Sequence, residues 1–230
     1  YKRQVENEIV RFDWVSGSTT PWLTLEPAAT GNRLNDGRTD SAGRFWVGSM
    51  YERPAAARST GMLHCVDTDG TARTIRHSIG VSNGIAFDPE RNRMYFADTL
   101  RDTVWSYRYD AATGEATDEA VFIDFSTLPG RPDGACVDGE GGYWVAAVYG
   151  AALLRFTPEG VLDRRIDLPV AAPSMPAFGG PNLDVLFVTS IGAGASRRLP
   201  ASELEPGVLL AIEPGTRGVA EVPVAAVGPA

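Results

Sequence analysis

Four short strands, each centred on an aromatic residue, recur along this chain at nearly constant spacing. Their segments are GRFWVGSM at 43–50, RMYFADT at 93–99, GYWVAAV at 142–148 and VLFVTS at 185–190. The central aromatics Trp46, Tyr95, Trp144 and Phe187 lie 49, 49 and 43 residues apart. A period in the forties, built from short β-rich segments and turns, is typical of a four-stranded propeller blade. The repeat therefore predicts that equivalent residues occupy equivalent places in successive blades.

Two further elements occur in register with the aromatic strands. Strand-like segments that end in acidic, Pro or Gly turns occupy 8–19, 62–72, 104–115, 153–160 and 209–218, and they predict hairpins. Polar triplets, which we call stations, precede three of the aromatic strands: Asn35-Asp36-Gly37, Ser82-Asn83-Gly84 and Pro132-Asp133-Gly134. Their glycines are 47 and 50 residues apart, so we expect the stations at the start of the innermost strands of successive blades.

Composition is that of a β-protein with many turns. The 230 residues are 43% hydrophobic and include 25 Gly and 16 Pro, which predicts one domain over 1–230. No window approaches 18 apolar residues, so we expect no membrane span, and the polar opening residues predict a cytoplasmic protein without a secretory leader. The net charge of -8 argues against nucleic-acid binding, whereas an acidic channel would attract a cation.

The scarcity of histidine and cysteine narrows the chemistry. His64 and His77 are the two histidines, which excludes a histidine-rich metal site, and we expect both in packing or surface roles. Cys65 and Cys136 lie in apolar strand segments and are expected to be buried free thiols. There is no phosphate-binding Gly-rich loop before a Lys-Ser or Lys-Thr pair and no His-Glu-x-x-His. The remaining candidates for a functional site are side chains that act through oxygen atoms.

Asn83 and Asp133 occupy matching stations, each directly before a Gly that allows the backbone to approach a ligand closely. An amide and a carboxylate oxygen that converge from neighbouring blades would suit one divalent cation, Ca²⁺ first, with Mg²⁺, Mn²⁺ or Zn²⁺ also compatible. The alternative is that Asn-Gly and Asp-Gly are merely common turn dipeptides. Spacing alone leaves both interpretations open.

A family resemblance adds to this reading. The runs RLNDGRTDSAGRFWVGSM at 33–50, SNGIAFDP at 82–89 with YFADT at 95–99, and RPDG at 131–134 with YWV at 143–145 resemble the gluconolactonase, regucalcin and senescence-marker-protein family. The resemblance implies a six-bladed β-propeller with one divalent metal in its channel, hydrolysing sugar lactones. It implies that Asn83 and Asp133 are metal ligands.

By the same resemblance, Arg33 and Asn35 hold substrate oxygens near the metal. The alternative roles are a structural salt bridge for Arg33 and a turn cap for Asn35. Glu52 falls in a loop where relatives carry acidic substrate contacts, with a register uncertain by one position. Asp98 is expected to bond turn amides and is left outside the site.

One family ligand, a Glu near the N-terminus, has no counterpart in this sequence, since Glu26 lies too close to the 33–50 run. The repeat count gives about four and a half blades, so we expect the N-terminal blade to be missing or incomplete. Either the chain is a fragment of a longer protein, which we favour, or the protein has lost that blade. An unclosed propeller would leave strand edges open to pairing.

The predicted function is metal-dependent opening of a sugar lactone, the small-molecule partner of this chain. Water attacks the carbonyl carbon, and Asp133 acts first as a ligand and second as a base. One alternative is a calcium-binding propeller that serves as a binding or regulatory module. Another is an esterase or phosphotriesterase on the same scaffold, because a fold does not determine function.

Overall fold

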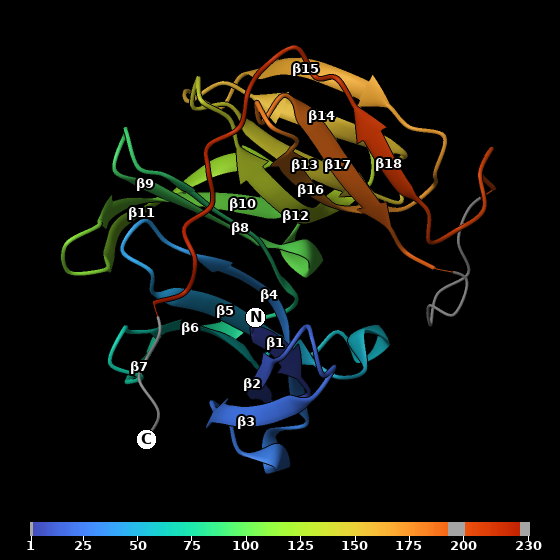
Figure 1. The fold of residues 1–230 in the computed structure, drawn as a ribbon. Helices are drawn as coiled ribbons and strands as arrows, with labels where there is room; N and C mark the ends of the chain where they lie inside the picture. The colour runs from blue at the N-terminus through green and yellow to red at the C-terminus, as the bar shows by residue number, and fades with distance from the viewer. Residues whose placement is uncertain (1, 193–200, 226–230) are drawn as a thin grey trace. The chain divides into compact units, whose positions relative to one another are not determined.

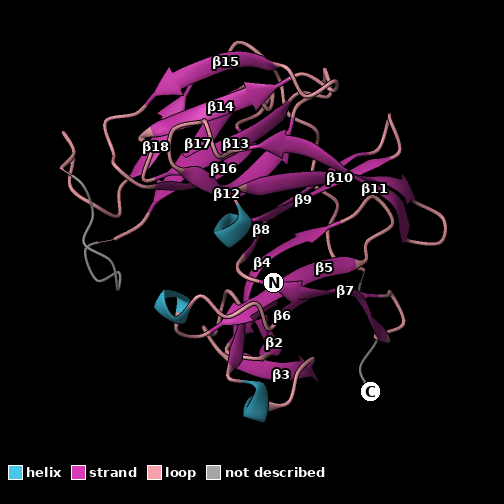
Figure 2. Cartoon of the chain, turned by 180° about the vertical axis from the view of Figure 1, so that it is seen from behind, coloured by secondary structure: helices cyan, strands magenta, loops and turns pink. Residues whose placement is uncertain are grey.

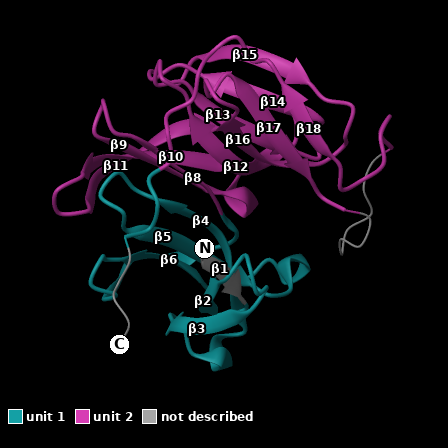
Figure 3. Ribbon diagram, viewed as in Figure 1, with its two compact units in different colours: residues 1–82, 222–230 teal, residues 83–221 magenta. Residues whose placement is uncertain are grey.

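The computed structural model describes residues 2–192 and 201–225. Antiparallel strands dominate these residues, and the described helices are three single turns of 3-10 helix (Figure 2). The helices are η1 (Ala28–Thr30), η2 (Pro54–Ala56) and η3 (Thr99–Arg101). The described residues fall into two compact units (Figure 3): unit 1 holds 2–82 and 222–225, and unit 2 holds 83–192 and 201–221. Among the described residues, no helix is long and apolar enough to span a membrane.

Unit 1 contains two antiparallel sheets (Figure 1). The first has the order β1-β2-β3, with β1 (Lys2–Val5), β2 (Glu8–Phe12) and β3 (Thr19–Thr24). The second has the order β4-β5-β6-β7, with β4 (Asn32–Thr39), β5 (Phe45–Tyr51), β6 (Gly61–Val66) and β7 (Ala72–Ile79). Their apolar faces share a core that includes Ile9, Leu34, Phe45, Val47 and Val66.

Unit 2 contains two four-stranded sheets and one three-stranded sheet (Figure 1). The first sheet pairs β8 (Ser82–Asp88), β9 (Arg93–Asp98), β10 (Thr103–Asp110) and β11 (Glu115–Asp124). The second pairs β12 (Arg131–Val137), β13 (Tyr143–Val148), β14 (Ala152–Phe156) and β15 (Leu162–Asp167). The third pairs β16 (Pro173–Gly179), β17 (Val185–Ser190) and β18 (Leu209–Ile212). The boundary between the units falls within β8, after Ser82.

The four aromatic-centred segments are confirmed as strands, and each is the second strand of its sheet: β5, β9, β13 and β17. Trp46, Tyr95 and Trp144 are fully buried, whereas Phe187 is 36% exposed on the three-stranded sheet. Strands β5, β9 and β13 are buried on both faces and therefore read as nearly continuous apolar runs in the sequence, whereas burial alternates along β17. Truncating a buried Trp to Ala lowers the free energy of unfolding by about 3–5 kcal/mol, so Trp46 and Trp144 anchor their sheets.

The prediction of an all-β protein is confirmed, and three of the described sheets have the four strands expected of a propeller blade. The expected total of six blades is not confirmed, because the described residues form five sheets, and two of these have three strands. The three stations lie in β4, β8 and β12, the first strands of their sheets, as the spacing predicted. Cys65 and Cys136 are buried free thiols, also as predicted. Burial raises the pKa of Cys65 to about 12, since the thiolate would lose its hydration.

Two cores hold the sheets of unit 2 together. One lies between β8–β11 and β12–β15 and includes Tyr95, Phe125, Tyr143 and Phe156. The other lies between β12–β15 and β16–β18 and includes Trp144 and Leu186. The sheet β12–β15 is therefore covered on both faces, which fixes the start of β12, where Asp133 lies, relative to both neighbouring sheets.

Candidate functional site

The stations are places where the strand ladder is interrupted. In β4 the pairing with β5 shifts between Leu34 and Gly37, and in β12 the pairing with β13 shifts between Pro132 and Ala135. Such bulges bend a strand and change the direction of the side chains next to it. The extra residues are Asn35 and Asp36 in β4, and Asp133 and Gly134 in β12.

Asn83 is connected to the segment of Asp133 by two hydrogen bonds. The side-chain amide of Asn83 donates to the hydroxyl of Thr99 over 2.8 Å, and this hydroxyl donates to the carbonyl of Pro132 over 2.7 Å. Asn83 is 6% exposed and Asp133 is half-buried. Two stations that are 50 residues apart in sequence thus lie side by side in unit 2.

Gly84 explains why β8 can lie so close to β12. Its φ is +61°, and a Cβ there would come within 2.6 Å of the Tyr143 hydroxyl and 3.3 Å of the Asp133 carbonyl oxygen. The Tyr143 hydroxyl also donates to the Gly84 carbonyl over 3.0 Å. Both the left-handed backbone and the lack of space require glycine here.

Arg33 and Asn35 form a second polar group, which lies in unit 1. The Arg33 guanidinium donates to the side-chain oxygen of Asn35 over 2.9 Å, and the Asn35 amide donates to the carbonyl of Ser82 over 2.8 Å. Asn35 therefore bonds a residue 47 positions away, which is not the local contact of a turn cap. Burial lowers the pKa of Arg33 from its ordinary value, and the charge of Glu52 opposes this shift. Glu52 is exposed, and its backbone N–H donates to the Gly31 carbonyl.

The donor set was tested against a divalent cation. Among the described residues, no group of three or more His, Cys, Asp or Glu side chains could hold a metal ion. Asn83 and Asp133 would supply one amide oxygen and one carboxylate, which are the donor types of a hard cation. The Asn83 amide nitrogen is turned toward Thr99, which turns its carbonyl oxygen the other way. In the chemistry of their donor atoms, the two residues fit such an ion.

Asp98 bonds a backbone amide of a turn, as predicted. It is 1% exposed, and its carboxylate accepts the Leu100 backbone N–H at the start of η3 over 3.0 Å. It also lies 3.5 Å from Arg101. Asp98 therefore fixes the turn that carries Thr99.

His64 has the packing role that the sequence predicted, whereas its buried partner, Glu26, is a contact that the sequence did not predict. Glu26 and His64 are 3% and 4% exposed and are 3.0 Å apart between Oε1 and Nε2. Burial raises the pKa of Glu26, but hydrogen bonds from His64, Ser49 and Asn32 outweigh it, so the pKa lies below its ordinary value. His64 thus has a buried structural role, and the isolated Glu-Pro dipeptide gave no signal for a partner 38 positions away.

The series of stations continues into β16. The pairing of β16 with β17 shifts between Pro173 and Met175, and the Ser174 hydroxyl lies 2.9 Å from that of Thr189. A Cβ on Gly134 would come within 2.7 Å of the Ser174 carbonyl oxygen, so this bulge lies beside the station of Asp133. Ser174 follows Asp133 by 41 residues, a spacing in the sequence that could have identified it.

The segment GVSNG at 80–84 has the Gly-x-Ser-x-Gly spacing of a serine-hydrolase nucleophile turn. Ser82 is fully buried at the start of a strand, and its hydroxyl has no hydrogen-bond partner among the described residues. A nucleophile turn would lead into a helix and expose the hydroxyl. The spacing is therefore not a nucleophile motif here.

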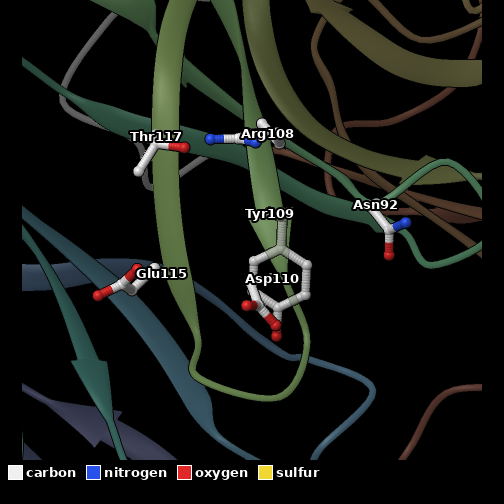
Figure 4. Close-up of a pocket in the computed structure, with 6 residues that line it drawn as sticks. All are labelled: Asn92, Arg108, Tyr109, Asp110, Glu115 and Thr117. Atoms are coloured by element: carbon white, nitrogen blue, oxygen red, sulfur yellow. The ribbon is translucent and has the colours of Figure 1, made fainter.

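A surface pocket of about 340 Å³ lies elsewhere in unit 2 (Figure 4). It lies at the hairpin between β10 and β11 and the turn before β9. Its lining residues are Asn92, Arg108, Tyr109, Asp110, Glu115 and Thr117. None of the predicted site residues lines it, so it is separate from the stations.

Comparisons with known proteins agree with the repeat pattern. A family model described as "SMP-30/Gluconolactonase/LRE-like region" matches residues 4–192. Pentonolactonase XacC of Haloferax volcanii is 38% identical over 160 residues, which are 70% of this chain and 54% of the relative. A 6-deoxy-6-sulfogluconolactonase of Pseudomonas putida is 36% identical over 191 residues, 83% of this chain and 65% of the relative. The chain thus spans less than two thirds of the length of these two relatives.

A solved structure gives a similar result. The calcium-binding protein regucalcin from Agrobacterium tumefaciens superimposes with a TM-score of 0.87 at 28% identity, covering 97% of this chain and 76% of that one. At this similarity the chain shares the β-propeller architecture.

Proposed function

Because the chain belongs to the SMP-30/gluconolactonase/LRE-like family, we propose that it carries cation and substrate residues of a six-bladed sugar-lactone hydrolase. The observation that carries the proposal is the pair of hydrogen bonds from Asn83 through Thr99 to Pro132. They bring an amide and the segment of a carboxylate together at neighbouring bulged strands. Relatives named pentonolactonase and 6-deoxy-6-sulfogluconolactonase indicate sugar lactones as the substrate class.

In this proposal Asn83 and Asp133 hold one divalent cation through oxygen atoms, Ca²⁺ first and Mg²⁺, Mn²⁺ or Zn²⁺ as alternatives. When bound, such an ion supplies Lewis acidity, which polarises a carbonyl and lowers the pKa of water. Relatives called regucalcin and a structure described as calcium-binding support the choice of Ca²⁺.

The reaction that we propose is the addition of water across the lactone ester bond. The water oxygen bonds to the carbonyl carbon, its proton passes to a carboxylate oxygen of Asp133, the ring C–O bond breaks, and the ring oxygen takes up a proton. Lactone and water thereby give one hydroxy acid. Arg33 donates to substrate oxygens, Asn35 orients the ring, and Glu52 accepts from a sugar hydroxyl. The partial burial of Arg33 strengthens its bonds to substrate, because less water competes for them.

A pH-indicator assay on a panel of sugar lactones tests the proposal. We expect chelation by EDTA to abolish hydrolysis, add-back of Ca²⁺ or Mn²⁺ to restore it, and Asp133→Ala to lower kcat/KM by about a hundredfold or more. The matched control is Asp167→Ala, whose side chain is 76% exposed, and which should keep full activity. Hydrolysis that survives both chelation and Asp133→Ala would disprove the mechanism.

The second candidate function is calcium binding without hydrolysis. It is supported by the regucalcin structure, which is described as a calcium-binding protein. The same preparation decides between the two candidates: titration with Ca²⁺ that gives saturable binding, together with no turnover on any lactone of the panel, would favour the binding protein.

A further inference from the structure

Resting on the proposed cation site, we propose that Thr99 is a positioning residue that sets which atom of the Asn83 amide faces the ion. Thr99 is the first residue of η3, directly after the N-cap Asp98. The cap bond and the Asp98–Arg101 ion pair fix this turn, so the Thr99 hydroxyl has a defined place between two strands.

The hydroxyl of Thr99 carries one proton and has two partners. The carbonyl of Pro132 can only accept, so the Thr99 proton must point to it over 2.7 Å. Toward Asn83 the Thr99 oxygen then acts as an acceptor, and the atom of Asn83 that meets it over 2.8 Å has to be the amide nitrogen. The orientation of the Asn83 amide therefore follows from proton counting as well as from the coordinates.

This orientation has a consequence for the ion. With its nitrogen held by Thr99, the amide directs Oδ1 to the opposite side and offers oxygen, the atom that a hard cation binds. Without the hydroxyl, the amide could turn by 180° and present N–H groups, which repel a cation. Thr99 thus selects one of two amide states of nearly equal shape.

The same hydroxyl acts on the second proposed ligand through the backbone. Pro132 is buried and directly precedes Asp133 in the bulge of β12. A bond from Thr99 to its carbonyl holds the bulge against the β8 station, where Gly84 leaves room for it. One hydroxyl therefore fixes both the rotamer of Asn83 and the spacing of the two strands.

Thr99→Val tests this role because it keeps the shape and removes the hydroxyl, while Thr99→Ser keeps the hydroxyl. Isothermal titration with Ca²⁺ and with Mn²⁺ should show affinity about 10- to 100-fold weaker in Thr99→Val and within about threefold of wild type in Thr99→Ser. Thr103→Val is the matched control, because the Thr103 hydroxyl donates to the Arg101 carbonyl over 2.8 Å, in the same turn. This control should bind like wild type.

A second readout does not depend on metal. The Asn83 side-chain amide protons, assigned in an ¹⁵N spectrum by their loss in Asn83→Ala, should exchange slowly in wild type and Thr99→Ser and rapidly in Thr99→Val. The wild-type measurement needs no Thr99 variant, so the test survives a Thr99→Val protein that fails to fold. Fast exchange in wild type would overturn the inference.

The outcomes separate this inference from the proposed function. Wild type that binds neither ion would refute the cation site and the inference with it. Wild type that binds Ca²⁺ while folded Thr99→Val binds equally well would refute the role of Thr99 alone. Equal losses in Thr99→Val and Thr103→Val would assign the effect to the stability of the turn and would also refute it.

Discussion

The sheets β4–β7 in unit 1 and β12–β15 in unit 2 each use a buried Asp to close the turn between their first two strands. Asp40 accepts the backbone N–H groups of Ala42 and Arg44 and the indole N–H of Trp46. In the other sheet the corresponding bonds join Asp138 to Glu140, Gly142 and Trp144. The spacing of two, four and six residues is identical, so each buried Asp closes the first turn of its sheet and fixes the anchoring Trp.

The two sheets differ in the source of the positive charge. Asp40 pairs with Arg44 from its own turn at 3.3 Å. Asp138 pairs with Arg155 from β14 at 2.7 Å, and position 142 in its turn is Gly. Arg155 lies opposite Trp144 in the strand register, whereas the residue opposite Trp46 is Cys65.

Both sheets therefore have a guanidinium beside the buried Asp, but the Arg that supplies it occupies a different position in the two repeats. A Cβ on Gly142 would overlap the guanidinium of Arg155, so an Arg in the third strand requires Gly in the turn. The repeat preserves a set of interactions, and residues at equivalent positions need not be alike.

Removing the carboxylate should have the largest effect. Asp138→Ala leaves an indole N–H and two turn amides without their acceptor and removes the closest buried partner of Arg155, which keeps Asp163 and Glu140. We expect a loss of about 3–5 kcal/mol in unfolding free energy. Asp40→Ala leaves the same kinds of donor without an acceptor, and we expect its loss to be smaller by about 1.5 kcal/mol, because its ion pair is longer, at 3.3 Å against 2.7 Å. Urea denaturation followed by tryptophan fluorescence measures both. Equal losses would show that the source of the guanidinium does not matter.

Exchanging the two arrangements should have an intermediate effect. Gly142→Arg alone places two guanidinium groups in one space, and Arg155→Cys alone leaves Asp138 without its cation, so each should destabilise by about 1–3 kcal/mol. The double variant places Arg in the turn and Cys opposite Trp144, as in unit 1, with Thr157 at the position of Asp67. We expect a favourable coupling of about 1 kcal/mol or more in a double-mutant cycle.

The control for this cycle is Gly139→Arg with Arg155→Cys. Gly139 lies in the same turn, and a Cβ there would meet only the Arg217 carbonyl at 3.4 Å. The effects of these two substitutions should add. Additivity in the Gly142 cycle as well would mean that the two positions do not exchange roles.

The same contrast shows what could be predicted from the sequence. Trp46 and Trp144 were recognised because their environment, a strand buried on both faces, imposes an apolar run and a fixed period. Asp40 and Asp138 each precede their Trp by six residues, so this pair of residues also recurs in the sequence at a fixed spacing. Arg155 had no such signal, because its role depends on strand register and on the glycine of another turn.

The candidate site also contains residues that the repeat predicted and one that it did not. The glycine spacing predicted that Asn83 and Asp133 occupy equivalent stations, and their placement in β8 and β12 follows that pattern. In the sequence, Thr99 is the last residue of the segment YFADT, and nothing there indicates a polar bridge. Its bridging role arises from the packing of two sheets, which brings the Pro132 carbonyl, 33 residues away, to its hydroxyl. Contacts between sheets depend on how whole strands pack, which short motifs do not encode.

The smallest expected effect is on the pH dependence of stability, to which Asp138 should contribute in acid. Burial raises the pKa of Asp138, but bonds from Arg155, Trp144 and the Gly142 amide outweigh it, so the folded pKa lies below the unfolded value of about 3.9. Its contribution to stability is complete above that value and is lost as pH falls through the folded pKa. Asp138→Asn cannot titrate, so its unfolding free energy should decline less steeply between pH 5 and 2 than that of wild type.

Urea titrations at each pH measure this slope, with Asp167→Asn as the control, since its exposed side chain should leave the wild-type slope unchanged. An unchanged slope in Asp138→Asn would contradict the assignment and direct attention to unit 1. There Glu26 is also held ionised by hydrogen bonds from buried neighbours, and Glu26→Gln would then be expected to flatten the acid limb. The acid limbs of Asp138→Asn and Glu26→Gln, each compared with wild type, thus show which of the two buried carboxylates contributes to the loss of stability in acid.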